Sequence, residues 1–318
     1  MNLTARIWLG DCLELIKSIP DGSVDLIAVD LPYGVTKSGW DKALPIDQLW
    51  AEYRRILTPT GTVVMTSMGI LTAKLMLSAD DLFKYSLVWK KSRATCVVQA
   101  KYRPMSAHED VLVFSKGKVG TRAKHPMTYN PQGLVELDKP LKRKQVGISA
   151  LYDSYADREH LNEWTQTHTN YPRSVQQFSS VARPVHNTQK PVALMDWIIR
   201  TYSNPGDVVL DNCLGSGTTG VAALAAGRNF IGIEKNPAFY ETAVKRIMDA
   251  APEGVTFDTD MPLPARDFVD EIIAKKREAY WAAQSSAKVV SLTRSCRTRP
   301  PKPDLIIDDV FSDYRLAA

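Results

Sequence analysis

The chain has 318 residues, of which 44% are hydrophobic and 24% charged, and its net charge is +5. This length can bury one large α/β core, alone or with a smaller module. No apolar run approaches the roughly 20 residues needed to span a bilayer, and Asp11 and Glu14 interrupt the apolar segment that a secretory signal would need. The four cysteines form no CxxC pair, which disfavours structural zinc and a disulfide framework. We therefore expect a cytoplasmic protein without a metal site.

The positive charge is concentrated in the middle of the chain. Residues 90–186 contain 16 Lys and Arg against 8 Asp and Glu, whereas the rest of the chain has a net charge of −3. Because neutralisation of phosphates drives affinity for nucleic acid, this distribution favours a polyanionic partner. A solvated, Lys-rich insertion explains the charge equally well at this point.

The first part of the chain alternates strand and helix patterns. A short strand is expected at 6–8 and helical spacing follows at 12–19. The nearly continuous apolar run "VDLIAV" at 24–29 is typical of a parallel strand that is covered on both faces. Apolar positions at helical intervals predict a helix over 46–57 that "TPTG" ends. Further buried strands are predicted at "TVVMTS", "LVW" and "EDVLVFSKG".

Periodicity fades from Lys116 to about Arg183, a segment rich in Pro, Gly, Tyr and basic residues, which predicts a mostly irregular insertion. Regular patterns return afterwards in the order helix, strand, helix, strand, helix: "PVALMDWIIRTY", "DVVLDN", "TGVAALAAG" ending on Gly227, "NFIGIE" and "PAFYETAVKRIMDA". Beyond 251 we expect one more helix over 265–284 and a basic tail. Strands that alternate with helices predict a doubly wound, mostly parallel sheet.

The segment "LDNCLGSGTTG" contains a glycine pattern between a predicted strand and a predicted helix. Gly215, Gly217 and Gly220 fit G-x-G-x-x-G, and Glu234 ends the following strand. Glycines let the backbone approach a ligand closely, and an acid one strand later can hold ribose hydroxyls. No Gly-Lys-Ser/Thr follows, so this is not a Walker loop. The pattern alone leaves open a nicotinamide or flavin enzyme, another nucleoside-binding protein, and a tight turn without a ligand.

The segment "DLPYG" places a carboxylate, Asp30, at the carboxyl end of a buried strand. Open α/β sheets bind their ligands at that end. Pro32 has a fixed φ and holds Leu31 extended, so the loop is rigid. Its acceptors and the ring of Tyr33 suit a planar group with an NH₂ at its edge. A simple strand-ending turn capped by Asp30 is the competing interpretation.

The segment "NTQKP" opens the helix before the glycine loop. Pro191 suits a first helical turn, and Thr188 and Lys190 could contact an anionic group at that helix start. As a lone pentapeptide it indicates little.

Together, and in this order, the three motifs resemble the S-adenosylmethionine-dependent amino-methyltransferases of DNA in the permuted arrangement called the β class. The resemblance covers about residues 5–248 without most of the insertion, and it includes "HEDVLVFSKG". It implies a seven-stranded, mostly parallel, Rossmann-like α/β sheet with an inserted target-recognition region. The corresponding division is 1–115 for the catalytic half, 116–186 for target recognition, 187–250 for the cofactor-binding half and 251–318 for a C-terminal extension.

The resemblance also implies roles for individual residues. Asp30, Leu31, Pro32 and Tyr33 match the catalytic tetrapeptide, in which proline is commoner than leucine at the second position; the family uses the carbonyl there, which leucine also has. Gly215 and Gly217 match the loop that passes the methionine part of the cofactor. Glu234 matches the acid that binds the ribose, and Asp11 matches the acid that contacts the adenine. The full cofactor-binding set is Asp11, Cys12, Thr188, Lys190, Asp211, Gly215, Ser216, Gly217, Thr218, Thr219 and Glu234.

The activity implied is methyl transfer from S-adenosyl-L-methionine to the exocyclic N6 of an adenine flipped out of duplex DNA. Asp30 and the Leu31 carbonyl would each accept one N–H of the amine while Tyr33 stacks on the base. Cytosine N4 is the alternative base, although a serine usually replaces Asp30 in those enzymes. RNA or protein methylation, a catalytically inactive DNA-binding protein and a nicotinamide-dependent oxidoreductase also stay open. So do a homodimer, a cognate restriction nuclease, and a bacterial or phage-infected host.

The basic run at 142–144 yields a first prediction. If Lys142, Arg143 and Lys144 contact phosphates, replacing all three with Gln weakens DNA binding and lowers the slope of log affinity against log salt by about one unit for each phosphate that is no longer neutralised. Cofactor affinity should not change, because other strands build that pocket. An unchanged salt slope in a titration at several salt concentrations would identify 116–183 as a solvated surface insertion.

Overall fold

The computed structural model describes residues 3–34, 43–120, 124–144, 163–182 and 189–259. In chain order the strands are β1 Thr4–Leu9, β2 Val24–Val29, β3 Leu57–Ser67, β4 Phe83–Thr95, β5 Ser106–Ser115, β6 Val135–Lys144, β7 Glu163–Thr169, β8 Val175–Phe178, β9 Val208–Asp211, β10 Asn229–Glu234 and β11 Thr256–Asp258. The helices are α1 Cys12–Leu15, α2 Ile46–Ile56, α3 Ile70–Ser78, α4 Val192–Tyr202, α5 Thr218–Ala225 and α6 Pro237–Ala250, with 3-10 turns η1 Ile16–Ser18 and η2 Val97–Gln99. Thr188 and the helix expected over 265–284 lie outside the described residues.

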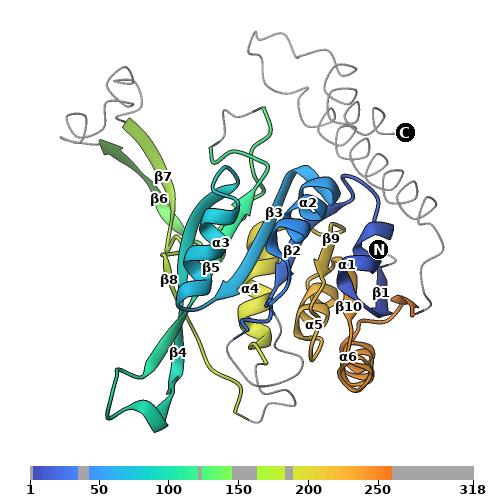
Figure 1. The fold of residues 1–318 in the computed structure, drawn as a ribbon. Coiled ribbons are helices and arrows are strands. Elements are labelled where there is room, and N and C mark those ends of the chain that lie inside the picture. The colour runs from blue at the N-terminus through green and yellow to red at the C-terminus, as the bar shows by residue number, and fades with distance from the viewer. Residues whose placement is uncertain (1–2, 35–42, 121–123, 145–162, 183–188, 260–318) are drawn as a thin grey trace, which may run out of the picture.

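A sheet of nine strands organises the fold, in the order β11-β1-β10-β9-β2-β3-β5-β4-β8 (Figure 1). All pairings from β11 to β3 are parallel, β5 runs antiparallel to both neighbours, and β8 pairs with β4 in parallel. The predicted α/β fold with a doubly wound, mostly parallel sheet is thus confirmed.

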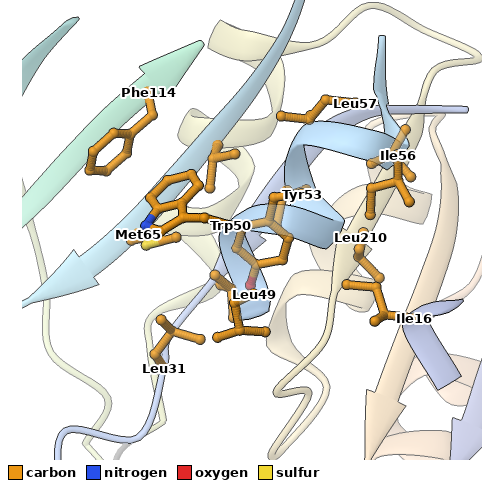
Figure 2. Packing of buried hydrophobic residues seen from close by; sticks show 14 of the residues in the cluster. Ile16, Leu31, Leu49, Trp50, Tyr53, Ile56, Leu57, Met65, Phe114 and Leu210 are labelled. Carbon is orange, nitrogen blue, oxygen red and sulfur yellow. The ribbon is translucent and has the colours of Figure 1, made fainter. Parts of the chain in front are cut away.

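Side chains of β2 alternate between two hydrophobic cores, one on each face of the sheet. Ile27 and Val29 pack in the core that α1, α2 and α3 cover, whereas Leu26 and Ala28 pack in the core under α4, α5 and α6. Every residue of β2 is buried, as the apolar run predicted, because helices occupy both faces. Figure 2 shows part of the first core, where Leu31, at the end of β2, lies near Leu49 of α2.

The structure differs from the sequence-based expectations at several elements. The sheet has nine strands where seven were expected. The helix ends before "TPTG" as predicted, but β3 already begins at Leu57 and includes this segment, whereas the strand was expected only over "TVVMTS". The described part of the insertion contains strands that were not predicted, since β6 and β7 form a two-stranded ribbon and β8 joins the main sheet. α3 and β11 were not predicted.

Two of the strands that were not predicted, β6 and β8, share a physical reason. β8 has the sequence "VQQF" and alternates exposed with half-buried residues at the sheet edge, and β6 is largely charged. Neither contains an apolar run, because each has a side open to water. Their strand conformation comes from backbone pairing with β4 and β7, partners that are distant in sequence. Such pairing leaves no periodic signal in a single segment.

Candidate active site

A cleft of about 1030 Å³ opens at the carboxyl ends of the parallel strands, where open α/β sheets place their ligands. Its walls come from the loops after β1, β2, β9 and β10, from β4 and β5, and from the start of α4. Most of the predicted site residues line it, namely Asp11, Cys12, Asp30, Leu31, Pro32, Tyr33, Lys190, Asp211, Gly215, Ser216, Thr218, Thr219 and Glu234.

The three glycines of the loop after β9 have different physical roles. Gly215 has φ +54°, lines the cleft, and a Cβ built there would meet only one atom, the Cys213 carbonyl oxygen at 3.9 Å. A Cβ on Gly217, with φ +78°, would lie 3.1 Å from the Ala243 backbone. A Cβ on Gly220 would lie 2.6 Å from Ile247. Gly215 therefore leaves space for a ligand, whereas Gly217 and Gly220 let α5 pack closely against α6.

Glu234 ties the end of β10 to the glycine loop. One carboxylate oxygen accepts a hydrogen bond from the Gly215 backbone N–H at 2.8 Å, and the other accepts from the Asn236 N–H at 2.8 Å. Burial raises the pKa of Glu234, and these backbone hydrogen bonds oppose the shift. Each oxygen keeps a lone pair for a further donor, so the carboxylate can accept from ribose hydroxyls while it positions the loop.

Asp211 lies behind the glycine loop. Its carboxylate accepts from the Cys213 N–H at 3.0 Å and from the Thr219 hydroxyl at 2.6 Å, which joins β9 to the first turn of α5. Burial is the main cause that raises the pKa of Asp211 to about 7.

Asp11 and Cys12 form the wall of the cleft that follows β1. Asp11 caps α1 by accepting from the Leu13 N–H at 2.9 Å, and it pairs with Lys235 at 2.8 Å. The hydrogen bond to Lys235 is the main cause that lowers the pKa of Asp11. The Cys12 thiol shares a hydrogen bond with Cys213, which lowers the pKa of Cys12 and raises that of Cys213. Both thiols are free.

The Asp30 carboxylate is held by three side chains. Oδ1 accepts from the Thr66 hydroxyl at 2.5 Å and from the Tyr33 hydroxyl at 3.0 Å, and Oδ2 accepts from Lys190 Nζ at 2.6 Å. Burial, followed by the charges of Asp30 and Glu109, raises the pKa of Tyr33, so its hydroxyl stays a neutral donor. A carboxylate offers about four acceptor positions, and one of them is therefore left for a ligand.

Lys190 belongs to a buried chain of alternating charges. Its ammonium lies 2.6 Å from Asp30 and 3.3 Å from Glu109, and Glu109 pairs with Lys91 at 2.6 Å. Burial alone would lower the pKa of Lys190, but the two carboxylates outweigh it and the pKa is raised. Lys190 was predicted as a cofactor contact, and the structure places its ammonium against the Asp30 loop, 5.7 Å from the centre of the Tyr33 ring.

Sequence reasoning missed Thr66, Glu109, Lys91 and Trp89, all of which line the cleft. The signals in the sequence were weak. Glu109 is a charged residue at the start of a buried strand, and Thr66 is a polar residue near the end of one. Neither signal identifies the partner, because Thr66 on β3 contacts Asp30 in the loop after β2, and Glu109 on β5 contacts Lys190 in the segment before α4.

The predicted DNA-binding residues lie elsewhere. Lys142 and Arg143 are exposed near the end of β6, which Lys144 ends. In Figure 1 the β6–β7 ribbon extends to the upper left, away from the lower ends of β2 and β3, and none of its described residues lines the cleft. The structure thus does not bring this basic run to the cleft.

Fold and cleft together define a class: an α/β protein that binds a nucleoside-containing ligand at the carboxyl ends of its strands, beside a loop that presents a carboxylate and an aromatic ring. The family model described as DNA methylase, for N6 and N4 methylation, matches residues 24–245. The chain belongs to this DNA methylase family, as the order of its motifs suggested.

Curated relatives agree with this assignment. The DNA adenine methyltransferase YhdJ of Escherichia coli K12 is 34% identical over 262 residues, which cover 77% of this chain and 83% of that protein. The type II methyltransferase M.HinfI of Haemophilus influenzae is 30% identical over 272 residues, which cover 77% of this chain and 69% of that protein.

Solved structures share the fold. The complex of M1.HpyAVI with S-adenosylmethionine superimposes with a TM-score of 0.53 and 25% identity over 76% of this chain and 99% of that one. The cytosine-N4-specific PvuII DNA methyltransferase gives a TM-score of 0.52 and 18% identity over 80% of this chain and 94% of that one. At that identity it shows a common fold alone.

Two further findings concern metal sites and membrane-spanning helices. In the described ranges, no group of three or more His, Cys, Asp or Glu side chains is arranged to hold a metal ion. Of the helices that the structure describes, none combines the length and the apolar content of a bilayer-spanning segment.

The buried Asp211 yields a prediction for stability. Its pKa is about 7 in the folded protein, against about 3.9 in an unfolded chain. Between these values the folded state binds a proton that the unfolded state does not, so Asp211 lowers the free energy of unfolding progressively from about pH 4 to pH 7. Asp211→Asn removes this titration. We expect the stability of the variant relative to the parent protein to rise over that range, by about 1.4 kcal/mol per pKa unit.

Urea unfolding at pH 5, 6, 7 and 8 measures this difference. The matched control is Asp249→Asn, at an exposed position of α6, which should show no comparable trend. A constant difference between Asp211→Asn and the parent at all four pH values would contradict the raised pKa.

Proposed function

We propose that this protein transfers the methyl group of S-adenosyl-L-methionine to the N6 amine of a target adenine in duplex DNA. The carrying observation is that the Asp30 loop and the Glu234-supported glycine loop open into one cleft. The methyl donor is the molecule bound in the M1.HpyAVI complex, and YhdJ, a relative, is named a DNA adenine methyltransferase.

The cleft suits such a cofactor. Gly215 leaves open space above the loop. Glu234 and Asp11 are carboxylates at the ends of the neighbouring strands β10 and β1, and they can accept from ribose hydroxyls and from the amine of adenine. When bound, the cofactor supplies an electrophilic methyl group. The protein residues bind and orient it beside the catalytic loop.

Asp30 acts on the amine that receives the methyl group. An exocyclic amine is a weak nucleophile because its lone pair is delocalised into the ring. The free acceptor position of Asp30 and the Leu31 carbonyl can take its two N–H bonds and hold the nitrogen in line with the methyl group. Thr66 and Lys190 fix the carboxylate in advance, so little reorganisation accompanies the reaction. Tyr33 offers a ring face against which a flipped base can stack.

The Leu31 position supports this mechanism. Its side chain is 5% exposed and packs in the hydrophobic core with Leu49. The buried side chain anchors the loop where the family commonly has a rigid proline, and the backbone carbonyl that the mechanism requires is present in both residues.

The finer family features belong to this proposal too. We infer that residues 116–186 carry target recognition, with 1–115 and 187–250 forming the two halves of the catalytic sheet and 251–318 an extension. A homodimer and a cognate restriction nuclease stay predictions from the family resemblance, and a cytoplasmic location stays a prediction from the sequence. Sedimentation of the purified protein measures the first of these.

Base identity is tested by sequencing DNA, with detection of modified bases, from cells that express the protein. We expect N6-methyladenine at one short recognition sequence. N4-methylcytosine alone would overturn the base assignment, and an unmodified genome together with binding of NAD by the purified protein would favour an oxidoreductase.

Variants of the two loops should separate catalysis from cofactor binding. Asp30→Ala and the isosteric Asp30→Asn should lower the rate of methyl transfer at least about 100-fold, with cofactor affinity within about threefold of the parent, since Asp30 faces the base. Glu234→Ala should weaken cofactor binding about tenfold, because it removes the acceptor and frees Gly215.

Calorimetric titration with the cofactor and single-turnover methylation assays measure the two effects. Glu234→Ala is a cleaner probe of the cofactor site than Gly217→Val, which would also disturb packing against Ala243. Loss of cofactor binding in both Asp30 variants, with normal binding in Glu234→Ala, would show that the two subsites are assigned the wrong way round.

A further inference from the structure

The tip between β4 and β5, residues 96–105, exposes an unusual set of apolar side chains. Val98 is 94% exposed, Tyr102 88% and Val97 67%. Single exposed apolar residues are common on soluble proteins, but several at one projecting tip mark a surface that contacts a partner. We call residues 96–105 the hairpin tip.

The hairpin tip has a defined backbone. Cys96 takes the left-handed conformation with φ +67° and starts the 3-10 turn η2. The Gln99 N–H donates to the Cys96 carbonyl at 3.0 Å, and the Gln99 carbonyl accepts from the Tyr102 and Arg103 N–H groups at 2.9 and 3.0 Å. These hydrogen bonds fix the turn that carries Val98 at its outer end.

Charge at the hairpin tip and its stem is of one sign. Residues 90–108 contain five Lys and Arg and no Asp or Glu. Lys91 is the ion-pair partner of Glu109, and the other four, Lys90, Arg93, Lys101 and Arg103, are exposed. A surface with four exposed cations around exposed apolar side chains complements the phosphates and bases of a nucleic acid.

The stem of this hairpin is a wall of the cleft. Trp89, Lys91 and Thr95 of β4 line the cleft together with Asp30. In Figure 1 the hairpin extends to the lower left, on the side to which β2 and β3 lead, and away from the β6–β7 ribbon. A duplex whose base reaches Asp30 would therefore lie against the hairpin tip.

From this geometry we propose that the hairpin tip is a contact site for duplex DNA, in addition to the target-recognition segment. Arg93, Lys101 and Arg103 contact phosphates, and Val98 and Tyr102 pack against the bases next to the target, where a flipped nucleotide leaves a gap in the stack. The proposal rests on the proposed function for the identity of the flipped base. A second copy of this chain is the competing partner, and the shared positive charge opposes it.

Two variants separate the two kinds of contact. The charge variant replaces Arg93, Lys101 and Arg103 with Gln, and the apolar variant combines Val98→Ser with Tyr102→Ala. The matched control is Leu77→Ser, which changes an aliphatic side chain that is 78% exposed on α3. All affected side chains are exposed, so the fold should be kept; thermal unfolding and cofactor titration check this.

The first measurement is affinity for a random-sequence duplex at several salt concentrations, by fluorescence anisotropy. We expect the charge variant to bind at least tenfold more weakly at about 0.1 M salt and its salt slope to fall by roughly two to three units, about 0.9 per phosphate contact. The control should match the parent protein.

The second measurement uses a duplex with the site found by sequencing, in which 2-aminopurine replaces the target adenine and reports flipping by its fluorescence. We expect the apolar variant to lose most of the fluorescence increase. On the same duplex with adenine at the target position, it should methylate at least tenfold more slowly, with unchanged cofactor affinity. Wild-type affinity, salt slope and flipping in both variants would overturn the proposal.

The competing partner has its own signature. If either variant turns a dimer into a monomer in sedimentation while its DNA affinity stays that of the parent, the hairpin tip is a protein contact and the proposal fails. Duplex affinity is measured independently of methylation. A protein that binds no S-adenosylmethionine and methylates no DNA would therefore refute the proposed function but would not test the DNA contact at the hairpin tip. The anisotropy titration tests that contact.

Discussion

The site depends on one buried ammonium group, that of Lys190, held between the carboxylates of Asp30 and Glu109. Its side chain is 9% exposed, so removal of one carboxylate would leave a buried charge without full compensation, a loss of about 3–5 kcal/mol in comparable cases. These three residues come from the loop after β2, the segment before α4 and the strand β5. The ion pairs therefore hold together parts of the cleft that are far apart in the chain.

The same constraint fixes the orientation of the Asp30 carboxylate. Lys190 holds one oxygen of the Asp30 carboxylate, and Thr66 holds the other. At the end of β10, Glu234 uses both oxygens to support the glycine loop and the start of α6. Each loop carries an acid that is oriented by neighbouring donors and still has acceptor capacity. Electrostatic preorganisation of this kind requires no covalent chemistry from the protein.

The basic residues that we propose as DNA contacts lie on two separate surfaces. Lys142 and Arg143 lie on the β6–β7 ribbon, at the upper left of Figure 1, whereas the hairpin tip with Lys101 and Arg103 extends from the wall of the cleft. The net charge counted over residues 90–186 includes both surfaces and does not distinguish them. The sheet separates them because β5 and β4 run antiparallel to each other and carry their connection beyond the cleft.

Local sequence determined the strands and helices that have a buried, periodic apolar face, from β2 "VDLIAV" to α6. It also determined the glycine loop and the Asp30 loop. Apolar periodicity, glycine and proline all affect the backbone within a few residues, so a short segment contains the whole signal. Only the tertiary structure decided the positions of β6 and β8, whose polar sequences become strands through pairing with distant partners. The tertiary structure likewise decided that Lys190 contacts Asp30 and Glu109. Asp30 and Lys190 are 160 residues apart, so the packing of the sheet brings them together and no spacing in the sequence predicts the ion pair.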